Sequence, residues 1–172
     1  MRKIVLVGYM AVGKTTIAQL LAEKIKIKAI DLDKIIESEV GLSISQIFEQ
    51  KGEIYFRKIE HELFKKALQS SESLIISTGG GTPCYANNHL LLKDQNVVSV
   101  YLKASLGLIL DRLKAAKKVR PVVASKTDEE LEEFVAKHLF ERSYFYHYAG
   151  NTIAVDNKTP EEICLEIIAL LG

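Results

Sequence analysis

Cysteine is scarce in this 172-residue sequence, and its histidines show no pattern of metal binding. The two cysteines, Cys84 and Cys164, lie far apart and form no Cys-x-x-Cys pair. Such cysteines fit a reducing cytosol, and we expect both to serve packing. The four histidines lack the spacing of metal ligands, so we expect structural or surface roles for them.

Long apolar runs and an excess of charge are also missing. No run approaches the roughly 20 residues that a membrane-spanning helix needs. The formal net charge is only +1, which gives no electrostatic footprint for nucleic acid or a membrane surface. The first residues, Met1-Arg2-Lys3, run directly into an apolar stretch, so we expect no signal peptide. We therefore predict a cytoplasmic monomer that binds neither nucleic acid nor membranes.

The composition is that of an ordinary globular protein. Hydrophobic residues make up 48% of the chain and charged residues 26%, and no internal repeat or low-complexity tract is visible. A chain of this length suits one domain with a sizeable core, so we predict a single domain over residues 1–172.

Apolar, β-branched runs alternate with amphipathic stretches along the chain. This alternation predicts an α/β fold in which a five-stranded parallel sheet is flanked by helices. The runs lack polar alternation, as expected for strands buried on both faces. We expect strands at Lys3–Val7, Lys28–Leu32, Leu74–Thr78, Val97–Leu102 and Thr152–Val155.

Helices are expected between these strands, and several have readable ends. Ser43, Thr127 and Thr159 each begin a capping box, which marks a helix N-terminus. The first of these boxes opens a short helix that should end before Gly52. The expected helices are Thr15–Ile25, Ser43 to before Gly52, Glu53–Leu68, Ser105–Ala116, Thr127 to about His147, and a terminal helix from Thr159.

Two segments stand outside the alternation of strands and helices. Residues 33–70 form a helical excursion that is too long for a plain crossover, and we expect a substrate-binding insert there. Residues 115–126 are polar, basic and aperiodic, which is typical of a mobile lid in an enzyme.

A phosphate-binding loop follows the first strand. Gly8-Tyr-Met-Ala-Val-Gly13-Lys14-Thr15 fits the pattern Gly-x-x-x-x-Gly-Lys-[Ser/Thr] and lies between a predicted strand and a predicted helix. Its glycines let backbone N–H groups turn toward a polyphosphate, and the helix directs its positive dipole end at the same anion. Lys14 supplies a cation for the β- and γ-phosphates, and Thr15 offers a hydroxyl to the magnesium ion that accompanies ATP.

Two carboxylates, Asp31 and Asp33, end the second predicted strand. In an open α/β sheet, ligands bind at the carboxyl edge of the strands, where the phosphate loop also lies. One carboxylate can then serve the metal and the other an acceptor hydroxyl. A helix-capping aspartate near a solvated one would give the same sequence pattern, but the neighbouring phosphate loop favours a functional role for both.

The candidate site is completed by a run of three glycines and by three separate arginines. Gly79-Gly80-Gly81 follows the third predicted strand, where it lets the backbone approach a ligand, although a flexible turn has the same composition. Single arginines are usually solvated. Arg57, Arg120 and Arg142 gain a shared role if the acceptor is an anion, since arginine holds a carboxylate bidentately.

In this order and spacing the motifs resemble the shikimate kinase family over essentially the whole chain. The set comprises Gly-x-x-x-x-Gly-Lys-Thr, Asp-x-Asp, Gly-Glu-x-x-Phe-Arg-x-x-Glu, Ser-x-Gly-Gly-Gly, Arg-Pro before two apolar residues, and a late Arg. The resemblance implies a P-loop kinase fold with a substrate-binding insert and a lid. It also implies transfer of the γ-phosphoryl group of ATP to the 3-hydroxyl of shikimate, with Mg²⁺.

The resemblance also carries roles to particular residues. It assigns catalysis to Lys14, Asp33 and Arg120, with Arg120 reaching the phosphates from the lid, and the metal to Thr15 and Asp31. The implied ATP-binding residues are Gly8, Ala11, Val12, Gly13, Lys14, Thr15, Thr16, Arg112 and Arg120, with Arg112 near the adenine. The implied shikimate contacts are Asp33, Arg57, Gly79, Gly80, Gly81 and Arg142, with Arg57 and Arg142 on the carboxylate.

The sequence departs from the family pattern in three places. Ala11 and Val12 stand where Gly followed by Ala or Ser is common, Val122-Val123 replace leucines, and Tyr144 replaces a proline. The first two are tolerable packing changes, and the third lies close to Arg142.

Three other functions share part of this pattern. A kinase for another small anionic alcohol, such as gluconate, would share the phosphate loop, but the remaining motifs fit shikimate better. A GTPase-like switch should carry Asn-Lys-x-Asp, and the nearest string, Asp156-Asn-Lys-Thr159, lacks the aspartate. An inactive phosphate-loop module should have lost Lys14 or the paired aspartates, which this chain keeps.

Overall fold

Five parallel strands form the centre of the molecule. The computed structural model describes residues 2–116 and 124–172. The strands are β1 (Lys3–Val7), β2 (Lys28–Asp31), β3 (Leu74–Ser77), β4 (Val97–Lys103) and β5 (Asn151–Ala154). They lie in the order β2-β3-β1-β4-β5, which confirms the predicted α/β fold with a five-stranded parallel sheet.

The sequence of β1 explains its central position. All five of its residues are buried, because β3 pairs with one edge of the strand and β4 with the other. Lys3 lies opposite both Leu74 and Val97, so the three strands start at the same level and end at the same edge. In the described residues, the buried apolar side chains form one contiguous cluster around this sheet.

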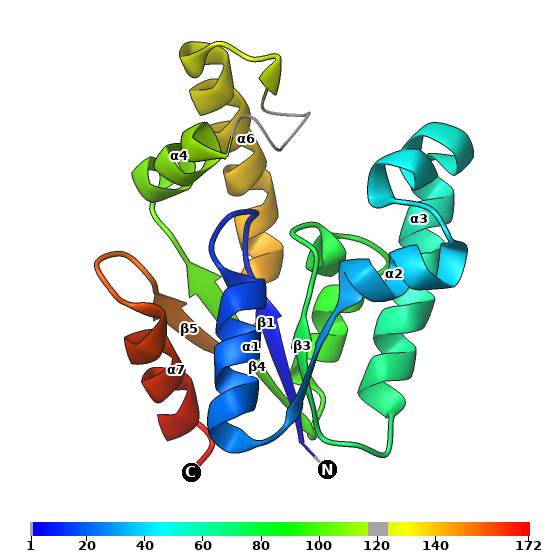
Figure 1. The fold of residues 1–172 in the computed structure, drawn as a ribbon, viewed down its shortest axis with the longest axis vertical. Coiled ribbons are helices and arrows are strands. Elements are labelled where there is room, and N and C mark those ends of the chain that lie inside the picture. The colour runs from blue at the N-terminus through cyan, green and yellow to red at the C-terminus, as the bar shows by residue number, and fades with distance from the viewer. Residues whose placement is uncertain (1, 117–123) are drawn as a thin grey trace.

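The helices stand around the sheet and above its carboxyl edge (Figure 1). They are α1 (Lys14–Ile25), α2 (Leu32–Val40), α3 (Ile44–Gln69), α4 (Leu106–Ala115), α6 (Asp128–Tyr146) and α7 (Pro160–Ala169), with short 3₁₀ helices η1 (Thr82–Cys84) and η2 (Asn88–Lys93). The helices α1 and α7 pack against each other. Beyond the carboxyl edge, α2 and α3 rise on one side and α4 and α6 on the other (Figure 1).

The three predicted capping boxes are present. Ser43, Thr127 and Thr159 each accept a hydrogen bond from the backbone N–H three residues on, and the side chain there accepts one in return. The two helices expected around Gly52 are present within α3, which is kinked where Gly52, with φ of 83°, leaves the helical conformation. The segment 33–70 therefore becomes a helical hairpin beside β2 and β3.

The predicted lid and its arginine fall mostly outside the described part of the chain. The expected lid at 115–126 and its Arg120 fall largely on residues 117–123, which lie outside the described residues. Among the described helices, none is long and apolar enough to cross a membrane.

Candidate active site

The loop between β1 and α1 has the shape that its glycines allow. Gly8 has φ of 150°, and a Cβ atom there would lie 2.7 Å from the Leu102 carbonyl oxygen, so only glycine fits. Gly13 caps α1 with φ of 98°. Lys14 follows in the first helical position, where its buried Nζ donates to the carbonyl oxygens of Gly8 at 2.6 Å and Tyr9 at 2.9 Å. The ammonium group is thereby held at the N-terminus of α1, beside the loop.

Ala11 adopts a backbone conformation that favours glycine, with φ of 65°. The left-handed region costs a residue with a Cβ atom about 1–2 kcal/mol, whereas glycine has more freedom to lose on folding, by about 0.4–1 kcal/mol. We therefore expect Ala11→Gly to raise the free energy of unfolding by about 0.5–1 kcal/mol, as measured by urea denaturation.

A matched control for this change is Ala22→Gly, which lies inside α1. There the backbone is helical, so the same exchange should lower the free energy of unfolding by about 1 kcal/mol. A less stable Ala11→Gly variant would mean that the packing of the Ala11 methyl group outweighs its backbone strain.

A cavity of about 300 Å³ lies at the carboxyl edge of the sheet. The structure brings together here the phosphate loop, both aspartates and the glycine turn, as the sequence predicts. The lining residues are Met10, Ala11, Gly13, Lys14, Thr15, Thr16, Asp31, Asp33, Thr78, Gly79 and Gly80.

Thr15 and Asp31 form a pair of oxygen donors in this cavity. The Thr15 hydroxyl donates to Asp31 Oδ2 at 2.8 Å and lies 3.3 Å from the Ser77 hydroxyl. Asp31 Oδ1 also accepts from the Lys34 backbone N–H at 3.3 Å and caps α2. The two interpretations of Asp31 are therefore compatible, because one carboxylate oxygen caps the helix and the other faces Thr15.

This donor set fits magnesium. Among the described residues, no group of three or more His, Cys, Asp and Glu side chains could hold a metal ion by itself. Mg²⁺ is commonly held by one or two protein oxygen ligands together with waters and nucleotide phosphates. A hydroxyl and one carboxylate beside a phosphate loop are sufficient for such an ion.

Asp33 lies deeper, against the glycine turn. A Cβ atom on Gly79 would approach Asp33 Oδ1 to 3.0 Å, so the missing side chain makes room for the carboxylate. Burial, followed by the nearby carboxylates of Asp31 and Glu60, raises the pKa of Asp33 to about 6, and Lys14 opposes this shift. A carboxyl group poised in this way can exchange hydrogen bonds and protons near neutral pH.

Arg57 and Arg142 reach the same turn from opposite sides. A Cβ atom on Gly81 would lie 2.7 Å from Arg57 Nη2, and one on Gly80 would lie 3.2 Å from Arg142 Nη1. The two guanidinium groups come from α3 and α6, which stand on opposite sides of the sheet edge (Figure 1). An anionic group placed between them could be held by both.

Two residues that support this turn were given no role by the sequence reasoning. Glu60 is 1% exposed and accepts from Arg57 Nη1 at 2.8 Å and from the Thr82 hydroxyl at 2.9 Å. The Tyr146 hydroxyl donates to the Gly80 carbonyl oxygen at 2.6 Å. Helical spacing could have indicated both residues from the sequence, because Glu60 lies three residues after Arg57 and Tyr146 four residues after Arg142.

A second cavity, of about 170 Å³, lies on the other side of the N-terminus of α1. Gly13 and Thr16 line both cavities, and Val12, Arg112, Lys158 and Pro160 are among the other lining residues. Arg112 Nη1 donates to the Ala11 carbonyl oxygen at 3.0 Å, which places this arginine beside the phosphate loop.

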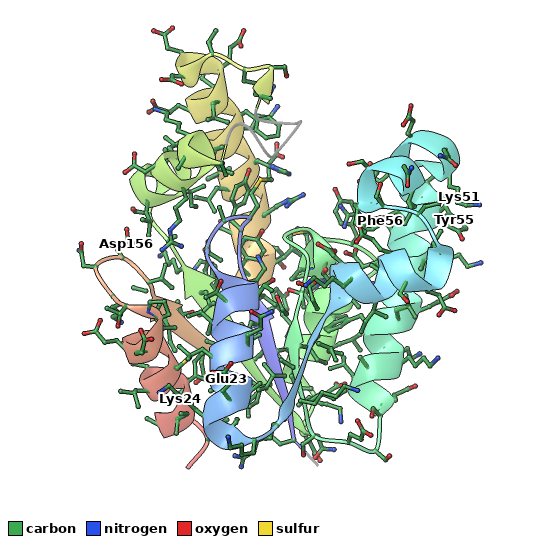
Figure 2. All side chains as sticks on the ribbon, in the orientation of Figure 1. Glu23, Lys24, Lys51, Tyr55, Phe56 and Asp156 are labelled. Atoms are coloured by element: carbon green, nitrogen blue, oxygen red, sulfur yellow. The ribbon has the colours of Figure 1, made fainter. Side chains whose placement is uncertain are left out.

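Asp156, the first residue of the string Asp156-Asn-Lys-Thr159, has a structural role. Asp156 lies in the loop between β5 and α7 (Figure 2), where its carboxylate accepts from the Ser105 backbone N–H at 2.9 Å and from the Ser105 hydroxyl. These hydrogen bonds hold the pKa of Asp156 below its ordinary value. Asp156 thus fastens the start of α4, the helix that carries Arg112.

Comparison with known proteins agrees with this geometry. The family model described as shikimate kinase matches residues 10–172. The shikimate kinase of Flavobacterium johnsoniae is 56% identical over 172 residues and covers 100% of both chains, and that of Flavobacterium psychrophilum is 50% identical and covers 99% of both.

Solved structures give the same result at lower sequence identity. The shikimate kinase of Bacteroides thetaiotaomicron superposes with a TM-score of 0.91 at 32% identity, covering 99% of this chain and 98% of that one. The enzyme of Acinetobacter baumannii, solved in complex with shikimate, gives 0.87 at 31% identity, covering 99% and 93%. The resemblance found in the sequence is confirmed, and the chain belongs to the shikimate kinase family.

Proposed function

We propose that this chain transfers the γ-phosphoryl group of ATP to the 3-hydroxyl of shikimate and so forms shikimate 3-phosphate for aromatic amino-acid biosynthesis. Its family supports the reaction, and a relative that shares its fold binds shikimate. The observation that carries the proposal is the glycine turn, against which Asp33, Arg57 and Arg142 all lie, at the sheet edge that also holds the phosphate loop.

The phosphate loop would bind ATP at the N-terminus of α1. The loop residues Gly8, Ala11, Val12 and Gly13 would surround the phosphates with backbone N–H groups, and Thr16 would extend this contact into α1. Lys14 would stabilise the charge between the β- and γ-phosphates. Arg112 would lie near the adenine, as the family resemblance implies, and it borders the second cavity beside the loop.

Mg²⁺ is the cofactor that we assign to Thr15 and Asp31. Their oxygens lie 2.8 Å apart in the cavity beside Lys14. When bound together with ATP, the ion supplies positive charge to the phosphate oxygens. The chain's own contribution is to hold this hydroxyl and carboxylate at fixed places, since Asp31 is also tied to the start of α2.

Asp33 would orient the acceptor hydroxyl and accept its proton. Phosphoryl transfer has a loose transition state, so positioning contributes more than strong base catalysis. Arg57 and Arg142 would bind the shikimate carboxylate from two sides, while Gly79, Gly80 and Gly81 allow the ring to approach the backbone. The resemblance gives Arg120 a phosphate contact from a lid at 115–126, although this arginine lies outside the described residues.

Other features of the protein remain proposals as well. We propose a single kinase domain over residues 1–172, with its substrate-binding insert at 33–70, that acts as a cytoplasmic monomer and engages neither nucleic acid nor membranes.

A coupled assay of ADP release tests the function as a whole. Shikimate, gluconate and a nucleoside monophosphate are each offered with Mg²⁺ and ATP. We expect turnover with shikimate alone, because neither other acceptor presents a ring carboxylate and a hydroxyl in this arrangement. Faster turnover with gluconate would favour the alternative of a kinase for another anionic alcohol, and faster turnover with the nucleotide would reject the acceptor site.

The activity should depend on pH through Asp33. In the free enzyme the pKa of this carboxyl group is about 6, and its ionised form is the one that can accept the hydroxyl proton. The kcat/KM for shikimate should therefore fall about tenfold per pH unit below about pH 6 and level off above about pH 7. Initial rates from about pH 5 to about pH 8 measure this, and a flat profile over that range would contradict a role for the Asp33 carboxylate.

The two arginines should control shikimate affinity. Arg57→Lys and Arg142→Lys keep the charge but lose the planar pair of donors, so each should weaken shikimate binding about tenfold or more. Isothermal titration calorimetry measures both ligands, and we expect ATP affinity to stay nearly unchanged. Arg2→Lys is the control, because Arg2 is exposed and precedes β1 at the opposite edge of the sheet. Unaltered shikimate affinity in both site variants would refute the carboxylate clamp.

A further inference from the structure

The turn after the glycines has an unusual backbone. The helix η1 ends at Cys84 and is followed by Tyr85. The next two residues, Ala86 and Asn87, both have positive φ angles, of 51° and 56°. Asparagine tolerates this region, but alanine is strained there. Strained turns of this kind persist where the surrounding structure holds them, and they often serve a site.

Asn88 holds this turn against α3. Its side chain is completely buried, donates through Nδ2 to the Thr82 carbonyl oxygen at 2.9 Å, and pairs through Oδ1 with His61 Nδ1 at 2.6 Å. The Asn88 backbone N–H donates to the Tyr85 carbonyl oxygen at 3.0 Å. The backbone of Tyr85 is thus tied to α3 one helical turn beyond Arg57.

The ring of Tyr85 stacks on the guanidinium group of Arg57. Arg57 Cζ lies 3.9 Å from the centroid of the Tyr85 ring, compared with 5.0 Å for Phe56 and 6.0 Å for Phe48. The guanidinium carbon therefore lies over the face of the Tyr85 ring, within the range of a cation–π contact. Tyr85 is 37% exposed, whereas the Arg57 side chain beside it is 15% exposed.

The hydrogen bonds of Arg57 do not fix its orientation by themselves. Nη1 forms a hydrogen-bonded ion pair with Glu60 at 2.8 Å, and Nε forms a looser ion pair with Glu53 at 3.6 Å but has no hydrogen bond in the described part of the chain. These two carboxylates restrain the edge of the guanidinium group. A ring against its face restrains the tilt of its plane.

We propose that Tyr85 is a positioning residue for shikimate binding, because its ring holds the guanidinium plane of Arg57 in the orientation that a carboxylate needs for two parallel hydrogen bonds. The inference rests on the proposed function, in which Arg57 binds the shikimate carboxylate. Tyr85 acts through the face of its ring and needs no hydroxyl, so phenylalanine should replace it and an aliphatic residue should not.

The test compares Tyr85→Leu and Tyr85→Phe by steady-state kinetics. We expect Tyr85→Leu to raise the KM for shikimate about tenfold, with kcat and the KM for ATP changed less than about twofold. Tyr85→Phe should restore the KM for shikimate to within about twofold of the original value. Tyr55→Leu is the matched control, because Tyr55 lies on the same helix as Arg57 but its ring contacts the ammonium group of Lys51. Its side chain lies away from Phe56, which contacts Arg57 (Figure 2).

A second measurement distinguishes a role of Tyr85 in orienting Arg57 from a general disturbance of the binding site. The methyl ester of shikimate lacks the charged carboxylate, so its KM should be nearly the same for the original protein and for Tyr85→Leu. The preference for shikimate over the ester should therefore fall about tenfold in Tyr85→Leu. Equal losses with acid and ester would show a merely structural role and overturn the proposal. Tyr85→Met gives the same comparison if Tyr85→Leu folds poorly by circular dichroism.

Arg57→Lys distinguishes failure of this inference from failure of the proposed function. If Arg57→Lys raises the KM for shikimate but Tyr85→Leu does not, Tyr85 has no positioning role and the clamp stands. If Arg57→Lys leaves that KM unchanged, the assignment of Arg57 to the shikimate carboxylate is wrong, and the inference about Tyr85 fails with it. In the Arg57→Lys background, Tyr85→Leu should add less than about twofold, because the planar group on which the ring acts is gone.

Discussion

Lys14→Ala is expected to lower kcat by about a hundredfold or more while the protein stays folded. The Lys14 ammonium lies at the N-terminus of α1 and donates to the carbonyl oxygens of Gly8 and Tyr9. In the proposed reaction, charge would build up beside it between the transferred and leaving phosphates. Its removal would take away this charge stabilisation. Single-turnover and steady-state rates measure the loss, and circular dichroism checks the fold.

Lys24→Ala is the matched control for this variant. Lys24 belongs to the same helix but lies in its last turn, far from the phosphate loop, and is exposed (Figure 2). Its replacement should leave kcat within about twofold of the original value, as is usual for a surface substitution. Near-normal turnover of Lys14→Ala would reject the assignment of this loop to the phosphates of ATP.

Asp33→Asn should lose most turnover but keep ATP affinity, and it should also make the protein more stable above neutral pH. Loss of the acceptor-orienting carboxylate should reduce kcat by about a hundredfold or more. The pKa of Asp33 rises from 3.8 to about 6 on folding, so the folded state favours the protonated form. The stability that this group contributes is present below about pH 4 and is lost as the pH rises through about 6.

At about pH 8 the ionised Asp33 therefore destabilises the folded protein, by on the order of 2–3 kcal/mol. Asparagine is never ionised, so the variant should unfold at a higher temperature there, and the difference should shrink toward about pH 4. Thermal unfolding at several pH values measures this, with the exposed Asp94→Asn as the control. If ATP affinity and turnover fell together in Asp33→Asn, Asp33 would belong to the nucleotide site instead.

Local signals in the sequence were sufficient for most of the fold. The capping boxes at Ser43, Thr127 and Thr159 mark helix starts because each satisfies backbone donors with side chains a few residues away. The central strands β1 and β3 were recognisable because runs buried on both faces need apolar residues throughout. The expected burial was wrong for β2 and β5, which lie at the edges of the sheet and are only partly buried. The strand order was beyond reach, since it depends on contacts between segments far apart in the chain.

The sequence predicted the types of residue in the candidate site, but not the contacts that hold them in place. Motif spacing indicated Lys14 and Asp33, because phosphate chemistry demands those residues beside a strand end. The stacking of Tyr85 on Arg57 was not predictable, because it depends on a strained turn and on the buried Asn88. The left-handed backbone of Ala11 was also hidden, because alanine gives no sequence signal for that conformation.

Identification of the product by nuclear magnetic resonance tests the central claim most directly. The protein is incubated with Mg²⁺, ATP and shikimate, and coupling between phosphorus and ring protons locates the new phosphate. Since Asp33 and the clamp of Arg57 and Arg142 share one glycine turn, we expect one product, phosphorylated on the 3-hydroxyl. Phosphate on another hydroxyl, or ATP hydrolysis without a phosphorylated shikimate, would contradict the proposed arrangement of loop, carboxylate and arginines.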